Sequence, residues 1–109
     1  MSPDRAYLND IVHSARLAIS HVSGLTFEDF LADTRAQDAV LWRLTVIGEA
    51  ARSVSEDAAA AMSDVPWRRI RGMRNFLVHE YWDVDQQIVW STLHDDLPQL
   101  ITRIEAYLP

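Results

Sequence analysis

The sequence contains no cysteine and no lysine, and its 109 residues include only three glycines and four prolines. Without cysteine the chain has no disulfide, no thiolate nucleophile and no cysteine-ligated metal, so its chemistry must use histidine, arginine, carboxylates or hydroxyls. No run of about 18 apolar residues is present, and no apolar segment follows a basic start, so we expect neither a membrane span nor an export signal. These absences predict a cytoplasmic protein.

The chain is rich in apolar residues, which make up 49% of it, and this is enough for the core of one globular domain spanning residues 1–109. The formal net charge is −6, and all ten basic residues are arginine. Four of these arginines lie in the stretch 65–79, which contains no acid: Arg68, Arg69, Arg71 and Arg74. A local positive field of this kind attracts a polyanion, while the acidic remainder keeps the protein soluble.

Apolar residues recur at the three and four spacing of amphipathic helices, and no alternating pattern of convincing strand length appears. The pattern predicts helices over 3–23, 34–54, 55–62, 67–81 and 84–104. Pro98 should break the last of these near Asp95 or Asp96. The expected fold class is therefore all-α, a bundle of four to five helices. The stripes expected to be buried are Leu8, Ile11, Val12, Ala15, Ala18, Ile19 and Val22 in the first helix, and Val40, Leu44, Ile47, Ala51 and Val54 in the second.

Local signals predict where the helices begin. Thr34 and Gln37 have the spacing of a capping box that opens the longest helix, and Asp83 and Gln86 repeat this spacing with Asp83 as the cap. Thr26 should cap a short turn whose inward-pointing side chains are Phe27, Phe30 and Leu31. The apolar surface of the helix over 34–54 is wider than one buried stripe, so we expect one flank to be covered by something other than its own core. The residues that widen it are Ala39, Trp42, Val46 and Ala50.

One helix face in the basic stretch carries groups suited to chemistry. A helical wheel places Arg71, Arg74, Asn75 and His79 on one side of the helix over 67–81, with apolar residues opposite and no carboxylate of the stretch among them. The planar fork of arginine holds two phosphate oxygens at once, and histidine titrates close to neutral pH. This face therefore predicts a phosphate-binding site with a proton-transfer group.

A plainer interpretation also fits this spacing: the two arginines are solvated, and the histidine lies near a helix C-terminus, where a cation is favourable by about 0.3 to 1 kcal/mol. Elsewhere His13 and His21 lie near one helix face without a carboxylate to complete a metal set, and His94 is expected at a solvated helix boundary. We therefore predict no metal site. The tryptophans are expected to serve packing or interfaces: Trp42, Trp67, Trp82 and Trp90.

The stretch 67–81 has the motif Arg74, four residues, His79, any residue, Tyr81, and it resembles the motif of HepT-like proteins in the HEPN superfamily. A lone arginine and histidine at this spacing is weak evidence, but flanking blocks in the same order make the resemblance specific. The blocks are Gln37-Asp38-Ala39-Val40, Val46-Ile47-Gly48-Glu49-Ala50, Pro66-Trp67, Asp85 with Val89-Trp90, and Asp96-Leu97-Pro98. Trp82, where another aromatic is more usual, is the one local departure.

The resemblance implies the toxin of a HepT/MntA-type toxin–antitoxin system: an endoribonuclease that cleaves RNA and is neutralised by a nucleotidyltransferase antitoxin of the MntA type. It implies that Arg74 and His79 are catalytic and that Tyr81 is the tyrosine the antitoxin adenylylates. It also implies a helical homodimer with the two motifs facing a shared cleft, in a hetero-oligomer with the antitoxin. We expect Arg71, Arg74 and Asn75 to bind RNA phosphate, and cleavage to need no metal or cofactor.

Two alternatives stay open. In the first, the HEPN fold is a noncatalytic nucleotide- or substrate-binding adaptor subunit of a nucleotidyltransferase, and Arg74 and His79 hold a nucleotide phosphate. In the second, the protein is a purely structural four-helix dimer. RNA cleavage by the isolated protein separates the first alternative from the nuclease, and its loss in a folded His79 variant separates the second.

Overall fold

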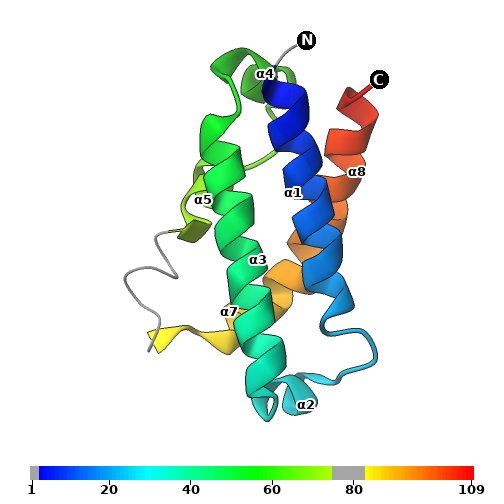
Figure 1. Ribbon diagram of the computed structural model, residues 1–109, viewed down its shortest axis with the longest axis vertical. Coiled ribbons are helices and arrows are strands. Elements are labelled where there is room, and N and C mark those ends of the chain that lie inside the picture. The colour runs from blue at the N-terminus through cyan, green and yellow to red at the C-terminus, as the bar shows by residue number, and fades with distance from the viewer. Residues whose placement is uncertain (1–2, 75–82) are drawn as a thin grey trace.

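The computed structural model describes residues 3–74 and 83–109, and three long helices form its frame (Figure 1). Helix α1 (Pro3–Ser20) packs against α3 (Thr34–Ser53) and against α8 (Leu97–Tyr107). The three run along the longest axis of a molecule that measures 43 × 29 × 21 Å (Figure 1). The described residues contain no strand, and the predicted all-α class is confirmed.

Shorter helices close the ends and one side of this frame. They are α2 (Phe27–Leu31), α4 (Glu56–Ala61), α5 (Trp67–Arg71), α7 (Gln86–Ser91) and the π-helical turn η2 (Thr92–Asp96). Helix α5 packs on α3, α2 contacts α3 and α7, and η2 contacts α1 and α8. Within the described ranges no helix is long and apolar enough to cross a membrane.

The core lies where the apolar stripes of the three long helices meet. All five residues predicted for the stripe of α3 are buried, and so is the predicted stripe of the first helix, except for the half-buried Ile19. Helix α8 completes the core with Leu97, Leu100, Ile101 and Ile104. The three and four spacing of the apolar residues therefore predicted which face of each helix is buried.

The longest helix begins one residue from the predicted cap. Asp33 is the N-cap of α3, and its carboxylate accepts a hydrogen bond of 2.9 Å from the amide of Ala36. The prediction that Thr34 caps this helix is wrong, because the adjacent carboxylate is a stronger acceptor for the free amides of the first turn. Gln37 instead donates to the carbonyls of Phe30 and Leu31 and so ties α2 to α3.

The start of α7 shows a similar shift. Asp85 is its N-cap and accepts a hydrogen bond of 2.9 Å from the amide of Gln87. Asp83 lies two residues before this cap, so the prediction that it caps the helix is wrong. Both aspartates precede the helix, and only the one directly before its first turn reaches the free amides.

The short helix α2 has the predicted Thr26 cap, with both bonds of a capping box to Asp29. Phe30 is fully buried and Phe27 packs against the core, and their rings lie 5.4 and 5.7 Å from that of Trp90. Leu31 is 50% exposed, so the prediction that it points inward is wrong. It follows Phe30 by about 100° around the helix axis, which turns it away from the face that the phenylalanines share.

The last helical region is divided where Pro98 predicts. The turn η2 ends at Asp96, and α8 starts at Leu97 with Pro98 in its first turn. Proline has no amide hydrogen and its ring clashes with the carbonyl four residues earlier, so it is tolerated at the start of a helix and not inside one. The π-helical turn η2, which is wider than an α-helical turn, lies directly before α8 and accommodates the break in the helix.

Candidate active site

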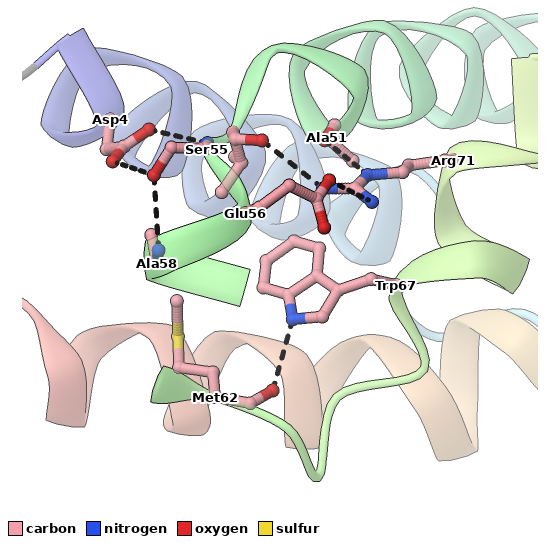
Figure 2. Close-up of polar contacts among 9 residues, drawn as sticks. Asp4, Ala51, Ser55, Glu56, Ala58, Met62, Trp67 and Arg71 are labelled. Carbon is pink, nitrogen blue, oxygen red and sulfur yellow. Dashed lines mark hydrogen bonds and ion pairs between the residues drawn. The ribbon is translucent and has the colours of Figure 1, made fainter. Parts of the chain in front are cut away.

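The basic stretch is fixed to the frame at the start of α5 by Trp67. This side chain is buried, and its indole nitrogen donates a hydrogen bond of 3.1 Å to the carbonyl of Met62, the C-cap of α4 (Figure 2). Ser55 is the N-cap of α4, and its backbone amide and hydroxyl both donate to the carboxylate of Asp4 on α1 (Figure 2). The segment that leads into α5 is therefore tied to α1 at one end and packed into the core at the other.

The predicted helix over 67–81 is interrupted by a turn at Gly72. Helix α5 ends at Arg71, Gly72 forms a turn, and Met73 and Arg74 are helical again. Glycine costs about 1 kcal/mol relative to alanine inside a helix, which makes Gly72 the natural place for the interruption. The part of the predicted helix over 67–81 that follows Arg74 lies outside the described residues.

Arg71 points toward the C-terminal end of α3 (Figure 2). Its Nε donates to the carbonyl of Ala51 at 2.9 Å and its Nη2 to the carbonyl of Val54 at 3.2 Å, while Nη1 lies 3.4 Å from the carboxylate of Glu56. The guanidinium also lies 5.9 Å from the centre of the Trp67 ring. The last carbonyls of a helix lack partners within it, and a cation is favourable there.

This geometry assigns Arg71 to capping α3. We expected it to share a phosphate-binding face with Arg74, but the two side chains are engaged with different parts of α3. All three guanidinium nitrogens of Arg71 already have protein partners. The wheel of one helix does not include the neighbouring helix end that binds this side chain, so the contact could not be predicted from it.

Arg74 lies against α3 about one turn before its C-terminal end, where its Nε forms an ion pair with the carboxylate of Glu49. Both side chains remain partly open to solvent, with 38% of Arg74 and 53% of Glu49 exposed. The basic stretch itself contains no acid, but α3 supplies a carboxylate to its arginine. Glu49 is the residue that the analysis of the basic stretch missed.

The backbones of α3 and of Arg74 meet at Gly48. A Cβ atom at this position would lie 2.7 Å from the backbone nitrogen of Arg74 and 3.3 Å from its Cβ. Gly48 is buried in the interior of a long helix, where glycine is less favourable than alanine. A glycine in the middle of an apolar helical stripe is the sequence signal for such a close approach.

A groove of about 1060 Å³ runs beside this region between α3, α5 and α7. Its lining is mainly apolar and includes Leu44, Trp67, Met73 and Ile88, with Arg68 and Arg69 also at its wall. Arg69 forms an ion pair of 3.0 Å with Asp96 on η2. Of the four arginines in the basic stretch, the structure thus shows protein carboxylate partners for Arg69, Arg71 and Arg74.

Three of the predicted site residues lie outside the described residues: Asn75, His79 and Tyr81. Elsewhere His13 is exposed on α1 and His21 is exposed in the turn after it, and His94 lies on Trp90, with ring centres 4.1 Å apart. Among residues 3–74 and 83–109, no three histidine, aspartate or glutamate side chains gather closely enough to hold a metal ion.

The helical bundle, with the arginine of an Arg-x4-His-x-Tyr motif held against its longest helix, is of the HEPN type. The family described as "Ribonuclease HepT-like" matches residues 11–107, and the chain belongs to this family.

Relatives of known name cover nearly the whole chain. A protein of Caldanaerobacter subterraneus subsp. tengcongensis that carries an RNase name is 35% identical over 99% of this chain and 96% of its own length. A protein of Thermococcus cleftensis that carries the name ribonuclease HepT is 36% identical over 91% of this chain and 90% of its own. One of Methanocaldococcus jannaschii, also with an RNase name, is 35% identical over 95% and 86%. No solved structure matches the chain.

Proposed function

We propose that this protein is a metal-independent endoribonuclease and the toxin of a HepT/MntA-type toxin–antitoxin pair. The observation that carries the proposal is Arg74: it is the first residue of the Arg-x4-His motif, it is fixed against α3, and it remains partly open to solvent. The family and the ribonuclease names of relatives that match nearly the whole chain support the same activity. A partly exposed guanidinium is available to a phosphate group of RNA.

The proposed reaction uses the ribose of the substrate as its nucleophile. The 2′-oxygen attacks the adjacent phosphorus as a base removes its proton, and the bond from phosphorus to the 5′-oxygen breaks as an acid protonates that oxygen. His79 supplies the base and the acid, and Arg74 stabilises the charge that develops on the phosphoryl oxygens. The products are a 2′,3′-cyclic phosphate and a 5′-hydroxyl.

The single histidine of the motif is short of two proton-transfer roles, and a homodimer with facing motifs supplies a second His79. The single chain leaves apolar surface uncovered: Trp42 is 62% exposed and Ile88 is 53% exposed. Trp42 belongs to the predicted flank of α3, and Ile88 lines the groove beside α5. A second subunit that covers these residues would bring the two motifs to one cleft.

We propose that the nuclease is inhibited when an MntA-like nucleotidyltransferase transfers AMP to Tyr81. The added phosphate stands two residues from His79 and competes with RNA phosphate for the same donors at high effective concentration. Intact-mass spectrometry after incubation with ATP and the antitoxin tests this part. An AMP-sized increment is expected in the wild type and not in Tyr81→Phe, and an increment that persists in Tyr81→Phe would show that another residue is the acceptor.

The nuclease itself is tested by incubating the purified protein with RNA in excess EDTA and identifying the ends of the products. Cyclic phosphate and 5′-hydroxyl ends, lost in a folded His79→Ala variant, are expected. Binding of nucleotides without any cleavage would favour the adaptor alternative.

A further inference from the structure

Two consecutive residues of α3 contact Arg74 in different ways. Gly48 lies against its backbone, so close that a Cβ atom would be 2.7 Å from the amide nitrogen. Glu49 forms an ion pair with its side chain at Nε. The contact with Gly48 fixes the position of the Arg74 backbone after the turn at Gly72, and the ion pair with Glu49 fixes the direction of its guanidinium.

We propose that Glu49 is a positioning residue, which orients the guanidinium of Arg74 for RNA phosphate. This inference rests on the proposed ribonuclease function. A guanidinium has five N–H donors in a fixed planar fork, and a carboxylate at Nε leaves the outer Nη donors for a second anion. Because Glu49 holds one edge of the guanidinium, the outer Nη edge keeps one orientation. The side chain of Arg74 therefore loses less conformational entropy when phosphate binds.

Gly48 is the residue that permits this arrangement. Glu49 follows it directly, so the close approach of α3 to the backbone of Arg74 brings the carboxylate within reach of Nε. Any side chain at Gly48 pushes Arg74 away from α3, because the nearest atom is backbone and has no flexible end to move aside. The Gly48–Glu49 pair therefore acts as one unit in positioning Arg74.

The ion pair joins two parts of the chain that are 25 positions apart, and both of its members stay partly open to solvent. The ion pair of Arg16 with Glu105 joins α1 and α8, away from the basic stretch. Glu105 is thus a matched control: a carboxylate of similar exposure, 46%, that pairs with an arginine outside the proposed site.

The kinetic test compares Glu49→Gln, Glu49→Ala and the control Glu105→Gln in RNA cleavage. We expect kcat to fall about fivefold in Glu49→Ala, the upper range for an exposed ion pair, with KM little changed. Glu49→Gln keeps an acceptor for Nε and should retain more activity, and Glu105→Gln should cleave like the wild type. In an Arg74→Ala background, Glu49→Ala should have no further effect, because the two residues act through one interaction.

Two kinetic results would overturn the proposal. A rise in kcat in Glu49→Gln would show that the carboxylate competes with RNA for Arg74. The same fivefold loss in the Arg74→Ala background would show that Glu49 acts by another route.

A second measurement does not depend on cleavage. The Nε–Hε resonance of Arg74 in a ¹⁵N-labelled sample, identified by its absence in Arg74→Lys, should shift in Glu49→Gln and in Gly48→Ala and stay in place in Glu105→Gln. An unchanged resonance in Glu49→Gln would overturn the positioning role, even if the protein cleaves RNA. If the wild type cleaves no RNA but the resonance shifts, the proposed function fails while the contact between Glu49 and Arg74 stands.

Discussion

The guanidinium of Arg71 closes the C-terminal end of α3, with its Nε 2.9 Å from the carbonyl oxygen of Ala51. Helix α3 carries Gly48 and Glu49 one to two turns before that end, and the same helix supports Arg74. Two arginines three residues apart in the chain thus meet one helix at two places. Arg71 caps the C-terminal end of α3, and Arg74 is held by Gly48 and Glu49 in the turns before it.

We predict that Arg71→Ala destabilises the protein by about 1 to 3 kcal/mol, because two carbonyls at the end of α3 lose a charged donor. Arg71→Lys should recover only part of the loss, since an ammonium group does not reproduce the planar fork. Urea unfolding followed by circular dichroism measures both. Arg68→Ala, which removes an exposed arginine of the same helix, is the control and should change stability little. Equal stability of Arg71→Ala and Arg68→Ala would contradict the capping role.

Gly48→Ala should destabilise the protein by about 1 to 3 kcal/mol, although alanine has the higher helix propensity. The reason is the 2.7 Å approach of the added Cβ to the backbone of Arg74. Gly72→Ala is the matched control, because a Cβ there meets its nearest atoms at 3.4 Å and the backbone is already right-handed helical. This variant should be neutral or more stable by up to about 1 kcal/mol. Thermal unfolding of the two variants gives the comparison, and the opposite order would show that α3 and Arg74 do not meet this closely.

The ion pair of Asp64 with Arg103 should make stability depend on pH in the acid range. Hydrogen bonds from Arg103 hold the pKa of Asp64 below its ordinary value of 3.8. Because the folded pKa is lower than the unfolded one, the stabilisation is fully present above about pH 3.8 and is lost as pH falls through the folded pKa. We therefore expect Arg103→Gln to be less stable than the wild type near neutral pH, and the gap to narrow below pH 3.8. Urea unfolding at several pH values tests this, and a gap that widens in acid would contradict it.

Trp42→Glu should shift the proposed homodimer toward monomer, because it places a charge on the exposed flank of α3. Light scattering at micromolar concentration measures the mass, and circular dichroism confirms that the variant is folded. Cleavage should fall with the dimer, since each proposed cleft uses two copies of His79. Glu28→Gln, an exposed change on α2, is the control. A monomeric wild type with full activity would contradict the shared cleft.

Sequence periodicity predicted the buried faces well, because burial of an apolar stripe dominates how a helix packs. The caps were predicted one or two residues away, at Thr34 and Asp83, since neighbouring polar residues compete for the same free amides and only the folded geometry selects one. Leu31 shows a related limit: the sequence gives its apolar character but not which side of a five-residue helix the core touches.

The sequence predicted the site residues that lie within the segment 67–81, but not the residues of other helices that contact them. The wheel identified Arg74 within a polar face, and the motif with its flanking blocks pointed to the family that the chain belongs to. The partners that α3 supplies to Arg71 and Arg74 lie more than fifteen positions earlier in the chain, and no periodicity within 67–81 contains them. Gly48, a glycine inside an apolar helical stripe, is the one sequence feature that could have indicated this contact, and it was not used in the prediction.

The proposed ribonuclease mechanism is tested most directly by the rate at which purified wild type, Arg74→Ala and His79→Ala cleave RNA in excess EDTA, each checked for folding by circular dichroism. We expect the wild type to cleave at the same rate with or without the chelator. The rate should fall by about 10²- to 10³-fold in Arg74→Ala and by about 10²- to 10⁴-fold in His79→Ala. Cleavage that requires added magnesium, or a folded His79→Ala variant that cleaves at the wild-type rate, would contradict the proposed ribonuclease mechanism.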